Sequence, residues 1–315
     1  MTVKSPSSIY ADLDVHVELD APLGPHTWYG IGGRADALVR PNTLAALQTL
    51  LRRCYRDGVP LRILGSGANL LVDDDGVDGI VVKLDTPAFK AVEFNASGHV
   101  ERMRAWGSAS TEKLVQECAR RGLAGLEQMS GIPSSIGGAV RMNAGGKYGA
   151  IGDAVDAVAI ATPEGELAIY AKDSLRFDYR ETNIPRGIMV WSSFCVTPSD
   201  AVACRKRVKE IFLYKRSTQP LAASSAGCMF RNPLLPSGAR ESAGKLIDLA
   251  GMKGARVGGA FVSPEHGNFL AVDKGARTDD LRALVERVRL AVLKTHSIEL
   301  ETEVVFWRRG EDAGL

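Results

Sequence analysis

The sequence predicts an α+β protein built from more than one compact unit. A chain of 315 residues is long for a single hydrophobic core, so two or three units are expected. Between residues 41 and 84, a helical pattern and short apolar strands follow in a βαβ-like order, typical of a small α+β or α/β lobe. Several short strands lie further along, as in an antiparallel α+β layer. The hydrophobic content of 45% and the charged content of 24% are those of a soluble globular protein.

The first lobe is preceded by residues 1–20, which are polar and weakly patterned and are expected to form an N-terminal tail. After Pro41, apolar residues recur at helical spacing, and Asn42 or Thr43 can cap the predicted helix. Two short strands are then expected, over residues 61–64 and 79–84.

The second lobe starts with a strand pair over residues 85–107, turning at Asn95–Gly98, and an amphipathic helix over 110–121. Strands are expected over 154–162, 166–170 and 188–196, and a helix over about 200–216. Residues 216–220 are interpreted as a hinge into a last domain. That domain is expected to hold helices over 241–251 and 279–296 and strands around 257–262, 268–272 and 298–307.

Charge and composition exclude several function classes. Thirty-nine Lys plus Arg against 37 Asp plus Glu leave +2, so no general attraction to nucleic acid or membrane is expected. The first residues lack the apolar core of a secretory signal, and no stretch is long and apolar enough for a membrane span. Five cysteines without metal-ligand spacing favour free thiols in a cytoplasmic protein, and scattered histidines argue against a metal site.

The segment Met129–Gly145 is the most informative stretch. Glycines alternate with apolar side chains, so we expect the segment to be packed inside, with its backbone close to a ligand. Exposed N–H groups in such a bend suit an anion, and Ser134, Ser135 and Asn143 add hydrogen-bonding groups. The alternative is a glycine-rich structural turn. We favour a phosphate-bearing ligand.

Other nucleotide signatures are weak or absent. Gly65-x-Gly67 follows a predicted strand, but Asn69 precedes an apolar pair and an acidic turn, which disfavours a Rossmann site. No P-loop pattern occurs. The basic helix around residues 205–209 is interpreted as a solvated face rather than a nucleic-acid patch.

Taken together, the motifs resemble one family, the UDP-N-acetylenolpyruvoylglucosamine reductases (MurB). The matching segments run in family order: Thr27–Gly33, Leu64–Val72, Ser130–Gly145, Tyr179–Arg180, Ser225–Pro233, Gly244–Ile247, Gly251–Gly254, His266–Phe269 and Leu300–Val304. The short connection between Phe194 and the helix near 202 resembles the shorter, second type of the family.

The resemblance implies a vanillyl-alcohol-oxidase (PCMH)-type FAD-binding fold of two subdomains plus a C-terminal α+β substrate-binding domain. The corresponding expectation is an FAD-binding region over 21–216, divided into 21–84 and 85–216, and a substrate-binding domain over 217–310. It further implies that NADPH reduces FAD and leaves, and that UDP-N-acetylglucosamine enolpyruvate is then reduced to UDP-N-acetylmuramate. A monomer without nucleic-acid or membrane partners is expected.

The resemblance also assigns site residues. The cofactor-binding set is Gly65, Ser66, Gly67, Ala68, Asn69, Leu70, Gly131, Ile132, Pro133, Ser134, Ser135, Gly137, Gly138, Asn143, Ala144 and Gly145. Asn232 and Lys245 are expected near the substrate diphosphate, and Arg180, Cys228 and Glu303 are expected to be catalytic.

The chemistry of these three residues agrees with the assignment. Hydride addition to an enol ether is eased when cationic or hydrogen-bonding groups polarise its carboxylate, the role that the family gives to Arg180 and Glu303. Cys228 stands where the family usually has a serine proton donor, and an unperturbed thiol, with a pKa of about 8.5, donates more readily than an alcohol. Read alone, Arg180 would be a surface arginine, Glu303 a strand-edge carboxylate and Cys228 a small buried hydrophobe. Glu303, however, is expected within an otherwise apolar strand that continues through residues 304–307.

Two alternatives remain at this stage. One is a different flavoprotein on the same cofactor fold, such as a sugar or hydroxy-acid oxidase. The other is a relative without activity that retains nucleotide binding as an interaction module.

Overall fold

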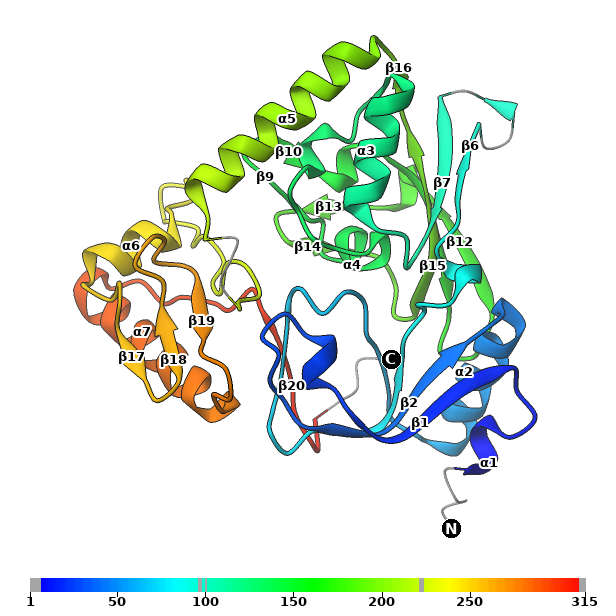
Figure 1. Ribbon diagram of the computed structural model, residues 1–315, viewed down its shortest axis with the longest axis horizontal. Helices are drawn as coiled ribbons and strands as arrows, with labels where there is room; N and C mark the ends of the chain where they lie inside the picture. The colour runs from blue at the N-terminus through cyan, green and yellow to red at the C-terminus, as the bar shows by residue number, and fades with distance from the viewer. Residues whose placement is uncertain (1–6, 96–97, 100, 221–223, 312–315) are drawn as a thin grey trace.

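The computed structural model describes residues 7–95, 98–99, 101–220 and 224–311. Three lobes follow one another along the chain and surround a central region (Figure 1). The first residues of the expected tail and the centre of the expected turn at Asn95–Gly98 lie outside the described residues.

The N-terminal lobe is a four-stranded sheet in the order β1-β2-β5-β3. Its strands are β1 (Val15–Pro22), β2 (Arg34–Pro41), β5 (Val77–Val82) and β3 (Leu61–Ile63). The expected helix is α2 (Leu44–Asp57), and of the two candidate caps Thr43 is the one used: its hydroxyl accepts from the N–H of Ala46 at 3.1 Å. Leucines on one face of α2 pack on the sheet, which fixes the βαβ order read from the sequence.

The expectation of a tail is wrong for residues 7–20. They form α1 (Ser7–Tyr10) and β1, which pairs antiparallel with β2 from Val15 opposite Pro41 to Pro22 opposite Arg34. Ile9 is fully buried against the side chains of α2. Val15, Val17 and Leu19 alternate with polar residues, the pattern of a strand that the expectation of a tail overlooked. β1 is an edge strand that is mostly exposed, and backbone pairing with β2 holds it in place.

The middle lobe is an antiparallel five-stranded sheet in the order β12-β11-β15-β7-β6. These strands are β12 (Leu167–Ala171), β11 (Val155–Ala161), β15 (Ile188–Cys195), β7 (Arg102–Trp106) and β6 (Val92–Phe94). The helices of this lobe are α3 (Thr111–Arg121), α4 (Ile136–Arg141) and the long α5 (Ala201–Thr218), which runs along its upper side in Figure 1. The predicted antiparallel layer is therefore present.

The glycine-rich segment is not a bend alone, because it contains α4. The hydroxyl of Ser135 caps this helix, accepting from the N–H of Gly138 at 3.4 Å, and Ile136 and Val140 are buried. The N–H of Gly137 donates to the carbonyl of Gly107 at 2.8 Å. Glycine disfavours helix, so the sequence did not predict α4.

The C-terminal lobe packs α6 (Ala243–Leu249) and α7 (Thr278–His296) with a small sheet, β17-β18-β19. The strands of that sheet are β17 (Arg256–Val257), β18 (Ala260–Val262) and β19 (Leu270–Val272).

Two details of this lobe differ from expectation. The last strand, β20 (Val305–Trp307), leaves the lobe and pairs in parallel with β4 (Leu70–Val72) beside the N-terminal sheet, as the red segment in Figure 1 shows. The expected hinge at 216–220 begins inside a helix, because α5 continues to Thr218. A two-residue overlap of helix and hinge is within the usual uncertainty of a boundary read from sequence.

The C-terminal lobe is also tied to the N-terminal lobe away from that connection. Asp74 caps α7 from outside, its carboxylate accepting from the N–H of Thr278 at 3.2 Å, and Asp73 pairs with Arg282 at 3.1 Å. Within the described residues, no helix combines the length and apolarity that crossing a membrane requires.

Candidate functional site

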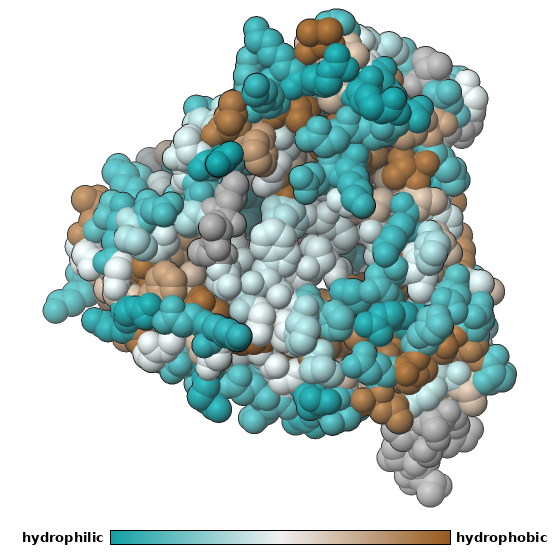
Figure 2. Space-filling model, in the orientation of Figure 1, coloured by the Kyte–Doolittle hydropathy of each residue, from teal (hydrophilic) through white to brown (hydrophobic). Residues whose placement is uncertain are grey.

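The three lobes meet around a cavity of about 590 Å³. The face in Figure 2 is pale, of intermediate hydropathy, near its centre, with hydrophilic side chains around it. The cavity lining includes most of the predicted cofactor residues, namely Gly65, Ser66, Gly67, Ala68, Asn69, Leu70, Gly131, Ile132, Pro133, Ser134, Ser135, Gly137, Gly138, Ala144 and Gly145. Arg180, Cys228 and Glu303 line the same cavity. Segments far apart in the sequence thus converge on one cavity.

The first wall is the loop between β3 and β4. Gly67 has φ of 68°, and a Cβ there would lie 2.0 Å from the carbonyl oxygen of His26, so only glycine fits without a shift of the backbone. Within the described part of the chain, the N–H groups of Ser66, Gly67 and Ala68 donate to no protein acceptor. Unpaired N–H groups on a cavity wall are suited to an anionic ligand.

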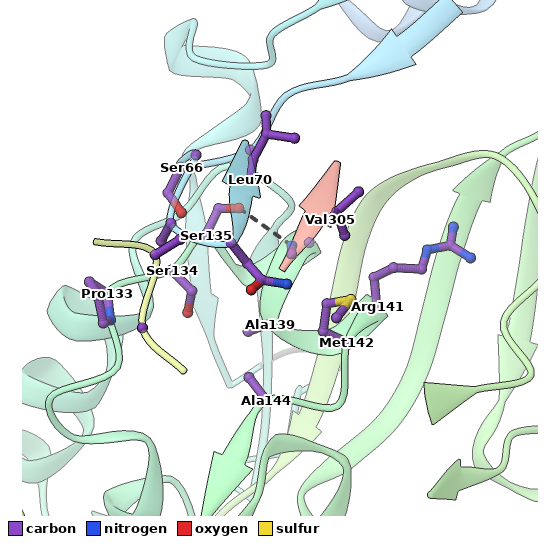
Figure 3. A pocket seen from close by; sticks show the side chains of 18 of the residues that line it. Ser66, Leu70, Pro133, Ser134, Ser135, Ala139, Arg141, Met142, Ala144 and Val305 are labelled. Atoms are coloured by element: carbon purple, nitrogen blue, oxygen red, sulfur yellow. Dashed lines mark hydrogen bonds between the residues drawn. The ribbon is translucent and has the colours of Figure 1, made fainter. Parts of the chain in front are cut away.

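The second wall is the glycine-rich segment, which approaches the first closely. A Cβ on Gly65 would lie 2.9 Å from the hydroxyl oxygen of Ser135. In Figure 3, Ser66 lies just above Ser135 and Ser134, and all three line the cavity. This cradle fits the pyrophosphate of a dinucleotide, because glycine lets both backbones reach it.

The charge of the lining is mostly positive. The cavity is lined by four arginines, Arg62, Arg141, Arg180 and Arg186. Among the described lining residues, Glu303 is the one carboxylate. The Arg141 guanidinium points away from the two serine loops (Figure 3) and donates to the carbonyls of Ile184, Pro185 and Gly187, each at 2.8 Å. Burial lowers the pKa of Arg141. An excess of fixed cations favours anionic ligands here.

Arg180 and Glu303 form an ion pair in this cavity. Arg180 Nε lies 2.5 Å from Glu303 Oε1, and the two side chains are only 18% and 14% exposed. A second guanidinium nitrogen donates to the carbonyl of Gly145 at 3.0 Å. Arg180 has φ of 58°, a conformation rare for a residue other than glycine and one that concentrates at functional sites.

The environment of Glu303 comes from two lobes. Burial raises its pKa, while the charge of Arg180 opposes that rise. Asn69 of the first loop donates from its amide to the Glu303 carbonyl at 3.0 Å. Glu303 was expected within an apolar strand, but it precedes β20 by two residues. The backbone of Glu303 is therefore held by Asn69, and its carboxylate by Arg180, rather than by a sheet.

Cys228 lies beside this pair. It forms an isolated antiparallel bridge with Phe269, and the carbonyl of the next residue, Met229, accepts from the N–H of Glu303 at 2.7 Å. Burial, and then the charge of Glu303, raise the pKa of the Cys228 thiol to about 12. The thiol is thus neutral near pH 7, as a proton donor must be. The buried Asn268 makes two hydrogen bonds to the backbone of Phe230 and so holds the segment that follows Cys228.

Three predicted site residues do not line the cavity. Asn143 is buried, and its side chain stabilises the fold by donating to the carbonyl of Asp178 at 2.7 Å and accepting from the N–H of Gly152 at 3.1 Å. The side-chain oxygen of Asn232 accepts from the N–H of Ala243 at 3.0 Å. Lys245 is exposed and pairs with Glu241 at 3.4 Å.

Sequence reasoning missed Arg240. Its guanidinium lies 4.1 Å from the ring centroid of Tyr179, the residue before Arg180, and donates to the Asn232 carbonyl at 2.8 Å. The side chain is exposed and has no carboxylate partner among the described residues. An exposed arginine in a loop carries no sequence signal, and only the fold brings it to Tyr179.

Two family models match the chain. One, described as an FAD binding domain, matches residues 35–169. The other, described as the C-terminal domain of UDP-N-acetylenolpyruvoylglucosamine reductase, matches residues 219–307.

Curated relatives and solved structures agree with these matches. A UDP-N-acetylenolpyruvoylglucosamine reductase from Moorella thermoacetica is 38% identical, with 95% of each chain covered. One from Heliobacterium modesticaldum is 39% identical, over 90% of this chain and 88% of the relative. The crystal structure of the reductase from Thermus caldophilus is similar with a TM-score of 0.78 and 34% identity, over 93% of this chain and 99% of that one. A chitooligosaccharide oxidase, 12% identical with a TM-score of 0.50 over 94% of this chain and 60% of its own, shows the fold alone.

The fold and the cavity define an FAD-binding protein of the vanillyl-alcohol-oxidase type, with an added C-terminal α+β domain. Within that class, the chain belongs to the UDP-N-acetylenolpyruvoylglucosamine reductase family. The relationship covers nearly the whole chain.

Proposed function

We propose that this protein reduces UDP-N-acetylglucosamine enolpyruvate to UDP-N-acetylmuramate, a step of peptidoglycan precursor synthesis in the cytoplasm, with FAD as cofactor and NADPH as reductant. One observation carries the proposal. An Arg180–Glu303 ion pair and the neutral thiol of Cys228 face the same glycine-walled, cationic cavity. The family membership supports the reaction and the cofactor.

The residues of the cavity fit FAD. The free N–H groups of Ser66, Gly67 and Ala68 and the hydroxyl groups of Ser134 and Ser135 would hold its pyrophosphate. When bound, FAD supplies hydride transfer, while the protein contributes binding, orientation and electrostatics. The cationic lining also suits NADPH and the UDP-sugar, since both carry phosphates.

The catalytic work of the chain falls on three residues. Arg180, held by Glu303 and the Gly145 carbonyl, would polarise the enolpyruvyl carboxylate, which favours hydride addition at the vinyl carbon. Cys228 would deliver the proton to the neighbouring carbon as a general acid. Asn69 and Asn268 would act as positioning residues, because they hold Glu303 and the Cys228 turn.

We assign FAD binding to residues 21–216 and substrate binding to 217–310. The diphosphate of the substrate would lie near Asn232, with Arg240 as its main cation, since the charge of Lys245 is already balanced by Glu241. The enolpyruvyl ether and the diphosphate are attached to the same pyranose ring. One substrate would therefore have to reach both arginines, and Arg240 and Arg180 lie 4.1 and 5.1 Å from the same ring centroid, that of Tyr179.

The test uses the purified protein. It should be yellow, NADPH should bleach the flavin anaerobically, and the enolpyruvyl UDP-sugar should restore the colour stoichiometrically. A protein that reoxidises only with oxygen would be an oxidase, and one that cannot be reconstituted with FAD would refute the proposal altogether.

A further inference from the structure

The proposed reduction chemistry does not use Lys215, a buried cation near the end of α5. Its side chain is nearly inaccessible, with 7% of the residue exposed. Its ammonium donates to the Ser130 carbonyl at 2.6 Å and to the Gln128 carbonyl at 3.2 Å. No carboxylate pairs with it in the described ranges. A buried charge without a counter-charge is costly, and negative charge arriving nearby would offset that cost.

The place of Lys215 connects it to the cofactor site. Ser130 immediately precedes Gly131, which begins the second wall of the cavity. A Cβ on Gly131 would lie 3.4 Å from Lys215 Cδ, so the lysine lies directly behind that wall. The Ser130 hydroxyl also donates to the Val208 carbonyl at 3.0 Å, which fastens the same loop to α5 a second time. The ammonium is thus held rigidly behind the loop.

Lys215 also lies within electrostatic reach of the reacting groups. Burial, and then the positive charge of Arg180, lower the pKa of Lys215 to about 8. The lysine therefore remains mostly protonated at pH 7. The charge of Arg180 is balanced by Glu303, whereas among the described residues the ammonium of Lys215 meets the carbonyl groups of Gln128 and Ser130 and no carboxylate.

We propose that Lys215 is a positioning residue that sets the reduction potential of the bound flavin. Uptake of a hydride adds a negative charge to a flavin, and a fixed, desolvated cation behind the cofactor wall favours that more negative state. The inference rests on the proposed function, because it requires FAD in this cavity. It assigns to α5 a part in the redox chemistry as well as in the connection to the C-terminal lobe.

The test is a potential measured without either substrate. FAD bound to each variant is reduced with dithionite beside a reference dye at fixed pH. Lys215→Gln keeps a hydrogen-bond donor and removes the charge, Lys215→Met removes both, and Lys215→Arg keeps both. Lys209→Met, an exposed lysine on the same helix, is the matched control.

Both uncharged variants should lower the equilibrium constant for two-electron reduction at least tenfold, a shift of about 30 mV to more negative potential. Lys215→Arg and Lys209→Met should match the unmutated protein. Unchanged potentials in Lys215→Gln and Lys215→Met, a shift in Lys215→Met alone, or loss of FAD from both, would overturn the inference and leave only loop bracing. An unmutated protein that binds FAD but does not turn over would refute the proposed reaction and leave this measurement intact.

Discussion

Replacing Cys228 with alanine should separate the two half-reactions. Reduction of the flavin by NADPH requires no proton at the enolpyruvyl carbon, so its rate should be unchanged. Reoxidation by the UDP-sugar should fall by about 10²–10⁴-fold, the usual contribution of a positioned acid. Among the described residues, the ionisable groups beside this thiol are Arg180 and Glu303, and these two are paired with each other.

The pKa of the thiol gives this prediction a second signature. With a pKa of about 12, the thiol is ionised in only about one molecule in 10⁵ at pH 7. Reoxidation should then show no loss of the acid between pH 7 and 9, whereas a thiol at its ordinary pKa of about 8.5 would lose most of its protons by pH 9.5. The same burial should make Cys228 slow to react with peroxide, because the thiolate is the reactive form.

Stopped-flow absorbance of the flavin measures both half-reactions in one preparation. Cys228→Ser, which restores the hydroxyl usual in the family, should retain appreciable turnover, and Cys195→Ala, at an exposed cysteine outside the cavity lining, is the matched control. Reoxidation of Cys228→Ala at the unmutated rate would show that the proton comes from elsewhere. A break in the pH profile near 8.5 that disappears in Cys228→Ser would show that the thiol is not shielded as the structure implies.

Three further predictions follow from the fold and the cavity. Gly67→Ala should lose FAD and at least about 1–2 kcal/mol of stability, because the φ of 68° and the His26 carbonyl oxygen, 2.0 Å from the new Cβ, exclude a methyl group. Unchanged flavin content and thermal unfolding would contradict this. Gly98→Ala, at a positive φ with open space around it, is the control for the backbone conformation alone. Arg240→Ala should raise the KM for the UDP-sugar at least tenfold and weaken inhibition by UDP but not by uridine, with NADPH reduction unaffected; equal losses for UDP and uridine would show that Arg240 does not contact phosphate. Asp74→Ala should cost about 1 kcal/mol of unfolding free energy by removing the cap of α7, while Glu299→Ala, in an exposed ion pair, should cost little; a thermal midpoint unchanged in Asp74→Ala would refute the cap.

Local sequence was sufficient where a pattern depends on near neighbours. Thr43 and Ser110 cap α2 and α3, and their apolar spacing placed both helices within a residue or two. The glycines of the cavity walls also signalled a close approach of backbone, which the structure has at Gly67 beside the His26 carbonyl. The resemblance then named Arg180, Cys228 and Glu303, and the structure brings all three to one cavity.

Long-range pairing decided the rest. β1 buries little of its alternating apolar pattern and is held by the pairing of its backbone with β2, and β20 leaves its own lobe to pair with β4. The high pKa of Cys228 comes from burial and from Glu303, which lies 75 residues further along the chain. Arg240 over Tyr179 and Lys215 beneath Ser130 are likewise contacts between segments with no shared local pattern. Sequence periodicity reports which face of an element is buried, whereas burial by a distant segment, and the charge that comes with it, exists only once the chain has folded.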